Sequence, residues 1–141
     1  IFAIGDIHGC SKTFKKLLLE KIVIKKSDKI YCIGDYVDRG NDSKGVIDFI
    51  INLRSEGYKI HTLRGNHEEM MMDSTINEQK LDRWLKYGGK ETLLSFGVSS
   101  VNELPKKYLT FLKQTKFFIA NNKSKIINHG TNDRSKRPFK T

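Results

Sequence analysis

Three short segments bounded by glycine contain the side chains best suited to chemistry. They are Gly5–Gly9 (GDIHG), Gly34–Gly40 (GDYVDRG) and Gly65–Glu68 (GNHE). Each one directly follows an apolar run with high β-strand propensity. Because ligands of open α/β sheets bind at the carboxyl ends of the strands, we expect these three segments to form one site.

The segments offer oxygen and nitrogen ligands for divalent metal ions. Asp6 and His8 are two positions apart, so in a continuing strand both would point to one face and bind one ion. Asp35 has two carboxylate oxygens and could bridge two ions. Asn66 adds an amide oxygen, and His129, after a later β-prone run, adds a nitrogen. This mixed set favours Mn, with Fe or Zn as alternatives, over Ca or Mg.

A centre with two divalent ions should attract a phosphate dianion. The ions' positive charge exceeds the negative charge of Asp6 and Asp35, and Arg39 adds a bidentate guanidinium. Ions about 3.5–4 Å apart can share a water and lower its pKa toward roughly 7, which provides a hydroxide for in-line attack on phosphorus. His67 is placed to protonate the leaving alkoxide, and Asp38 could orient its imidazole.

Single motifs also have purely structural interpretations. An isolated Asp-x-His is commonly a turn with a capping Asp and a surface His. Met70–Met72 could form a sulfur patch, but such residues more often fill a core. Trp84 is interpreted as core or as a cleft wall, His61 as a core histidine and Arg64 as the brace of a turn. The conjunction of four strand ends, each with a metal-competent residue, favours the functional interpretation.

The elements that must position these residues alternate between strand and helix in the first half of the chain. The pattern predicts strands at 1–5, 30–34 and 58–64 and helices at 11–22 and 43–56, with Ser11 and Ser43 as N-caps. Helical pieces follow at 67–73, 77–87, 89–95 and 105–114, and then a hairpin of 117–121 and 125–129. The alternation indicates an α/β fold with parallel strands followed by a helical insertion.

The motifs resemble those of the calcineurin-like metallophosphoesterases, specifically the small bacterial and phage type of the phosphoprotein phosphatase branch. That pattern is GDxHG, GDxxDRG, GNHE and a later His-Gly, and all four are present. The resemblance implies a β-sandwich flanked by helices with a helical insertion, rather than a simple doubly wound sheet. It implies a metal-ligand set of Asp6, His8, Asp35, Asn66 and His129, with Asp35 shared by two ions.

The same resemblance implies a function. His67, Asp38 and Arg39 would act in catalysis, with Arg39 and Asn66 binding substrate. The predicted activity is hydrolysis of phosphoserine and phosphothreonine in a phosphoprotein or phosphopeptide, with two divalent ions as cofactors and Mn favoured. Two alternatives stay open: a hydrolase similar to bis(5'-nucleosyl)-tetraphosphatase, and a non-catalytic module that binds phosphate.

Composition narrows the class of protein. The chain has 141 residues, which predicts a single domain over 1–141, and it opens on Ile1 inside a strand. The family's further Gly-His segment is missing after His129, so we expect truncation at both ends. The net charge of +10 comes mostly from scattered Lys residues, which predicts a solvated surface and no nucleic-acid partner. With no apolar run long enough to cross a bilayer, we expect a cytoplasmic protein without a membrane partner.

Overall fold

A parallel three-stranded sheet forms the first half of the molecule. The computed structural model describes residues 1–120 and 125–127. The strands are β1 (Phe2–Ile4), β2 (Lys29–Cys32) and β3 (Lys59–Thr62), in the order β1-β2-β3. Ile4 pairs with Cys32, and Cys32 pairs with Thr62. The three strands therefore end at the same level, and the loops that follow them leave the sheet along one edge.

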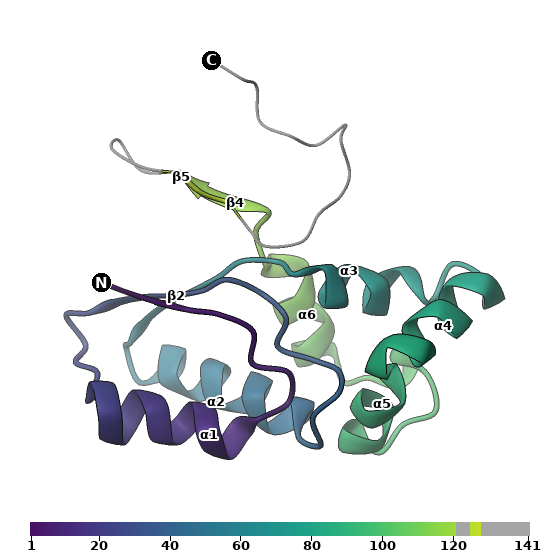
Figure 1. The fold of residues 1–141 in the computed structure, drawn as a ribbon, viewed down its shortest axis with the longest axis horizontal. Helices are drawn as coiled ribbons and strands as arrows, with labels where there is room; N and C mark the ends of the chain where they lie inside the picture. The colour runs from purple at the N-terminus through teal and green to yellow at the C-terminus, as the bar shows by residue number, and fades with distance from the viewer. Residues whose placement is uncertain (121–124, 128–141) are drawn as a thin grey trace.

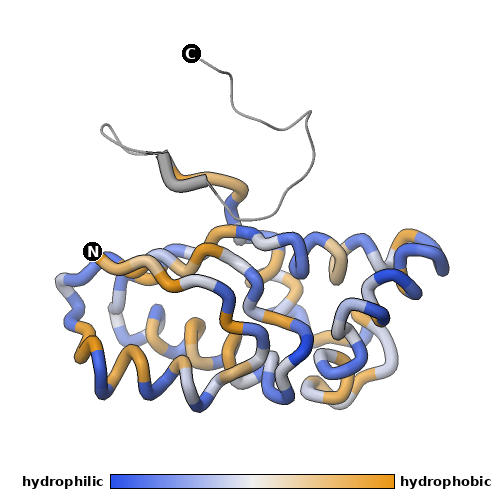
Figure 2. The backbone as a smooth tube through the Cα atoms, viewed as in Figure 1, coloured by the Kyte–Doolittle hydropathy of each residue, from blue (hydrophilic) through white to orange (hydrophobic). Residues whose placement is uncertain are grey.

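Helices α1 (Ser11–Lys16) and α2 (Ser43–Ser55) pack beside each other along the sheet (Figure 1). A π-helical turn, η1 (Leu17–Ile22), continues α1. Blue and orange alternate along these helices in Figure 2, as expected for amphipathic segments. The buried side chains between helices and sheet include Phe14, Leu18, Ile30, Cys32, Val46, Ile47, Ile50 and Ile60. Burial of this apolar surface fixes the sheet edge that carries the motifs.

The helix starts differ from the predicted caps. Ser11 and Ser43 are the first residues of their helices, so the prediction that they are N-caps is wrong. Asp42 caps α2 by accepting a hydrogen bond from the Gly45 N–H at 2.9 Å, and its carboxylate also accepts one from the Ser11 hydroxyl. A carboxylate can accept several such bonds, and here it ties the starts of α1 and α2 together beside the motif loops.

The second half is helical, as predicted. Its elements are α3 (Asn66–Asp73), α4 (Glu78–Trp84), the turn η2 (Leu85–Gly89), α5 (Lys90–Phe96), the 3₁₀ turn η3 (Val101–Glu103) and α6 (Lys106–Gln114). Gly88, at φ 108°, makes the kink between α4 and α5. Arg64 braces this half against the sheet, because its guanidinium donates to the carbonyls of Leu112 and Thr115 at 3.2 Å, at the end of α6.

A hairpin completes the described chain. β4 (Phe118–Ala120) pairs antiparallel with β5 (Lys125–Ile127), which confirms the predicted hairpin, and Leu63 and Lys116 form a parallel bridge beside β3. Within 1–120 and 125–127 the strands form one parallel sheet and this hairpin, so the two-sheet sandwich itself stays a prediction. Across the same residues, every helix is too short or too polar to span a membrane. The cytoplasmic location stays a prediction.

Candidate metal centre

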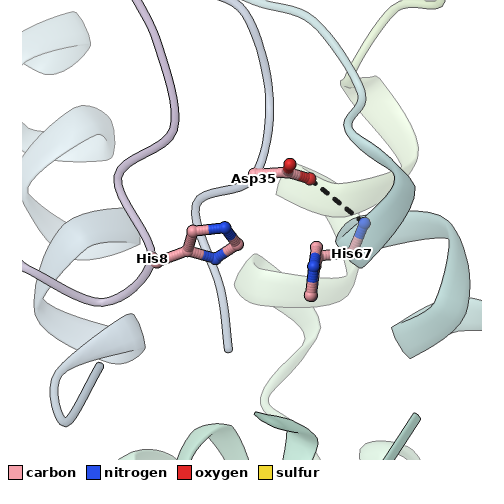
Figure 3. Close-up of side chains that lie close together, drawn as sticks. All are labelled: His8, Asp35 and His67. Atoms are coloured by element: carbon pink, nitrogen blue, oxygen red, sulfur yellow. Dashed lines mark hydrogen bonds between the residues drawn. The ribbon is translucent and has the colours of Figure 1, made fainter. Parts of the chain in front are cut away.

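Three of the predicted site residues converge at the carboxyl edge of the sheet. His8 lies on the loop after β1, Asp35 on the loop after β2, and His67 in the first turn of α3 after β3 (Figure 3). Each contributes one ligand atom, and these atoms all lie within 4.8 Å of one another. The His8 nitrogen and the Asp35 oxygen form a mixed donor pair suited to Mn, Fe or Zn, and the His67 imidazole lies beside them.

Backbone contacts hold the three loops together. The Asp35 carbonyl accepts hydrogen bonds from the N–H groups of Ile7 at 3.0 Å and His8 at 2.8 Å. The Asp35 Oδ1 accepts another from the His67 N–H at 3.1 Å. His8 has φ 44° and β1 ends at Ile4, so the argument that Asp6 and His8 share one face of a continuing strand is wrong. The loop, rather than the strand pleat, brings His8 to Asp35.

In both histidines Nδ1 is engaged by an oxygen atom, which leaves Nε2 as the available nitrogen. The Nδ1 of His8 lies 2.8 Å from the Val37 carbonyl, which can only accept, so this nitrogen carries the proton. The Nδ1 of His67 lies 2.7 Å from Asp38 Oδ2. The two rings meet edge to face with centroids 4.6 Å apart. Hydrogen bonds of this kind fix the tautomer and orientation of imidazoles in metal sites.

His67 and Asp38 form a buried pair. His67 is 2% exposed and Asp38 is 0% exposed. Burial lowers the pKa of His67, but its hydrogen bond to the Asp38 carboxylate and the negative charges of Asp38 and Asp35 outweigh burial, so this pKa is raised from 6.5. Proximity to two carboxylates therefore favours the imidazolium form, as a general acid requires.

A second buried carboxylate, Glu68, joins the loop after β2 to the start of α3. Its oxygens accept hydrogen bonds from the N–H groups of Asp35 at 2.8 Å, Tyr36 at 2.7 Å and Gly65 at 2.9 Å. Burial and then the charge of Asp35 raise the pKa of Glu68 to about 7, against the lowering effect of the backbone N–H donors. Glu68 thus positions the backbone of Asp35 without facing solvent.

The remaining predicted residues lie around this group. Arg39 is exposed, and its backbone N–H donates to the Gly88 carbonyl at 3.2 Å. Asn66 is half-buried as the first residue of α3. Asp6 is exposed and lies outside the group formed by His8, Asp35 and His67. His129 lies outside the described residues. The ligand roles of Asp6, Asn66 and His129 stay predictions.

Sequence reasoning missed three contributors to the site. Glu68 belonged to a recognised motif but had no predicted role. Trp84 is fully buried, and its Nε1–H donates to both oxygens of Asp38 at 2.9 and 3.0 Å. Thr92, which carried no sequence signal, donates to Asp38 Oδ1 at 2.7 Å. For Trp84 and Thr92 a sequence clue is the nearby Gly88-Gly89 pair, which marks a tight turn.

Comparisons with known proteins agree with this geometry. Residues 1–140 match the family described as calcineurin-like phosphoesterase. Serine/threonine-protein phosphatase 1 of Salmonella typhimurium is 36% identical over 89 residues, which cover 63% of this chain and 38% of that protein. The symmetrical bis(5'-nucleosyl)-tetraphosphatase of Buchnera aphidicola subsp. Schizaphis graminum is 43% identical over 86 residues, covering 60% of this chain and 30% of that protein. The chain thus spans about a third of the length of these curated relatives.

A solved structure is similar to this one in fold. A mutant of a cold-active protein tyrosine phosphatase superposes with a TM-score of 0.62 at 22% identity, covering 83% of this chain and 38% of that chain. At this identity the likeness concerns the fold. Together with the motif loops and the match along the chain, it confirms the predicted metallophosphoesterase fold, and the protein belongs to the calcineurin-like phosphoesterase family.

Proposed function

We propose that this protein is a metal-dependent phosphomonoesterase that hydrolyses phosphoserine and phosphothreonine in proteins. The observation that carries the proposal is the convergence of His8, Asp35 and His67, with a buried acid, Asp38, behind His67. The relative named as a serine/threonine-protein phosphatase supports this substrate class.

The donor set fits divalent metal ions. Asp35 and His8 would hold them, together with the predicted ligands Asp6, Asn66 and His129. When bound, two such ions, with Mn favoured, supply positive charge that binds phosphate and acidifies a water molecule. Burial of Asp35 would strengthen this electrostatic attraction, because the effective dielectric constant falls away from solvent.

The side chains of the chain itself then handle the proton and the phosphate. His67 is fixed through Nδ1 by Asp38, so its Nε2–H is free to donate a proton to the leaving oxygen as the P–O bond breaks. The hydrogen bond to Asp38 favours the protonated imidazole. Arg39 is exposed beside this pair and would bind two phosphate oxygens through its guanidinium.

A specific observation favours a second candidate, hydrolysis of dinucleoside tetraphosphates. A groove of about 800 Å³ runs along α4 and η2 to the start of α5, and its lining includes Arg83, Lys86, Lys90 and the half-exposed ring of Tyr87. It lies next to Gly88, whose carbonyl contacts the backbone of Arg39. Cations and an aromatic ring in one groove suit further phosphates and a stacked base.

One experiment separates these candidates. Mn²⁺-dependent phosphate release from a phosphoserine peptide is compared with hydrolysis of diadenosine tetraphosphate by the same preparation. Preference for the peptide supports the proposal, and preference for the dinucleotide supports the second candidate. Lys86→Glu should then weaken the dinucleotide reaction selectively, with Lys59→Glu at the opposite end of the strands as the control. Inactivity on both substrates, with metal bound, would leave the non-catalytic phosphate-binding module.

A further inference from the structure

The Asp38 carboxylate receives hydrogen bonds from three side chains that are far apart in the sequence. The His67 Nδ1 lies 2.7 Å away, the Trp84 Nε1–H donates at 2.9 Å to the same oxygen, and the Thr92 hydroxyl donates to the other oxygen at 2.7 Å. All four residues are buried. The carboxylate therefore has one orientation in which these donors are satisfied together, and leaving any of them unpaired would be costly.

Thr92 also stabilises the backbone of Asp38. Its hydroxyl oxygen accepts a hydrogen bond from the Asp38 N–H at 2.8 Å while the hydroxyl proton goes to the Asp38 carboxylate. The Ser43 hydroxyl lies 3.2 Å from both the Asp38 nitrogen and the Thr92 hydroxyl. Asp38 and Arg39 have φ of 72° and 69°, a left-handed conformation that L-residues adopt at an energetic cost. Thr92 is placed to offset that cost.

Two glycines let the helical segment formed by α4, η2 and α5 (residues 78–96) approach the loop after β2 closely enough to make these contacts. A Cβ on Gly89 would lie 2.5 Å from the Trp84 ring, and a Cβ on Gly88 would lie 2.6 Å from the Arg39 nitrogen. The indole thus packs directly on backbone, which restricts its rotation and holds Nε1 toward Asp38. The turn between α4 and α5 places both Trp84 and Thr92 at the Asp38 side chain.

We propose that Trp84 and Thr92 are positioning residues that hold the Asp38 carboxylate and thereby aim the His67 imidazole at the leaving oxygen of the substrate. This inference rests on the proposed acid role of His67. Neither residue touches the group of His8, Asp35 and His67 through a hydrogen bond of its own; both act through Asp38. The helical segment is thereby a functional part of the centre.

The first test compares Thr92→Val with Thr92→Ser. Val keeps the side-chain shape and removes the hydroxyl, whereas Ser keeps the hydroxyl. Loss of such a supporting contact typically costs about 10–100-fold in activity. We expect Thr92→Val to lower kcat for a phosphoserine peptide by this factor at unchanged KM, while p-nitrophenyl phosphate, whose leaving group needs little protonation, changes less than about threefold. Thr92→Ser should restore the peptide activity.

Equal losses on both substrates, or no loss on the peptide, would overturn the positioning role. In an Asp38→Asn background, Thr92→Val should cost less than about threefold on the peptide, because residues that act as a unit are not additive. A full additional loss there would also contradict the inference. Wild-type protein that is inactive on the peptide would instead contradict the proposed function.

A spectroscopic measurement tests the contact independently of turnover. Trp84 is the single tryptophan, so the indole N–H gives one assignable NMR resonance. We expect slow hydrogen exchange at this group and an upfield shift with faster exchange in Asp38→Asn, because the acceptor loses its charge. The exposed Asp82→Asn variant should leave the resonance unchanged. An indole resonance insensitive to Asp38→Asn would refute the proposed contact.

Discussion

Glu68 has no exposed surface, and its carboxylate accepts hydrogen bonds from four backbone N–H groups of two separate loops. An amide has a single acceptor oxygen and would turn its own N–H₂ toward one of these donors. We therefore expect Glu68→Gln to lower the free energy of unfolding by about 2–4 kcal/mol, the cost of leaving buried donors unpaired. Urea unfolding measures this, and the exposed Glu56→Gln serves as the matched control. Similar stabilities of the two variants would contradict the role of Glu68.

Asp35 provides a second prediction for a single residue. Its φ of 54° is in the left-handed region, which Asn tolerates well, so Asp35→Asn should keep the fold. Because Asp35 is proposed to bridge two ions, the substitution should remove most bound metal and the hydrolytic activity together. Elemental analysis of dialysed protein measures the metal, with Asp82→Asn as control. A wild-type metal content in Asp35→Asn would sink the bridging assignment.

The turn between α4 and α5 is the element on which the centre depends most directly. Gly88 has φ 108°, and a Cβ there would clash with the backbone of Arg39, whereas Gly97, at φ 65°, has open space around it. Gly97→Ala should therefore cost only about 1 kcal/mol from backbone strain. Gly88→Ala should cost at least about 2 kcal/mol and also reduce activity, because the contact with Arg39 is lost. Equal thermal stability of the two variants would show that the turn adapts.

Helices α2 and α6 are linked by Asp48, which accepts hydrogen bonds from Lys44 at 2.9 Å, Tyr108 at 2.8 Å and Lys107 at 3.2 Å. Partial burial raises the pKa of Asp48, but these donors together outweigh burial and lower it from 3.8. The folded state therefore binds the proton of the Asp48 carboxyl less tightly than the unfolded state does. The stabilisation by Asp48 is present above the pKa of this carboxyl in the unfolded chain, and it is lost as pH falls through its pKa in the folded protein.

The lowered pKa of Asp48 leads to a prediction about how stability depends on pH. Wild type should exceed Asp48→Asn in unfolding free energy by about 1 kcal/mol at about pH 6, and the difference should shrink toward about pH 3. Urea unfolding at several pH values measures it. Asp73→Asn, which removes only an exposed ion pair to Lys80, should show a smaller difference throughout. A constant Asp48 difference across this range would refute the linkage.

At the scale of the whole molecule, the parallel sheet and the helical segment share a buried network rather than a solvated boundary. Trp84 belongs to the helical segment, so its fluorescence monitors the folding of that segment. Its indole N–H donates hydrogen bonds to Asp38 on the loop after β2. Loss of either part would leave buried polar groups unpaired, so we expect both to unfold together. Trp84 fluorescence and far-ultraviolet circular dichroism should give coincident urea transitions. An earlier fluorescence transition would mean that the helical segment unfolds by itself.

The sequence alone was sufficient to predict the types and order of the helices and strands, the position of the motif loops at the strand ends, and the family. The spacing of apolar residues that distinguishes strands from helices involves only residues a few positions apart. It can therefore be recognised in the sequence without knowledge of the fold. His8, Asp35 and His67 could be predicted to meet because parallel strands end at a common edge. The N-cap of α2 was misassigned because Asp42, one residue before Ser43, accepts the hydrogen bond from the Gly45 N–H, whereas α1 follows Cys10 and has no side-chain cap.

Tertiary structure decided what holds the centre in place. His8 reaches Asp35 through a left-handed loop residue, not through the pleat of a strand. Trp84 and Thr92 lie 46 and 54 residues from Asp38 along the chain, so no local pattern could pair them with it. Hydrogen bonds over such separations exist only once helices and sheet have packed, because packing brings the donors to the carboxylate and excludes the water that would otherwise satisfy it.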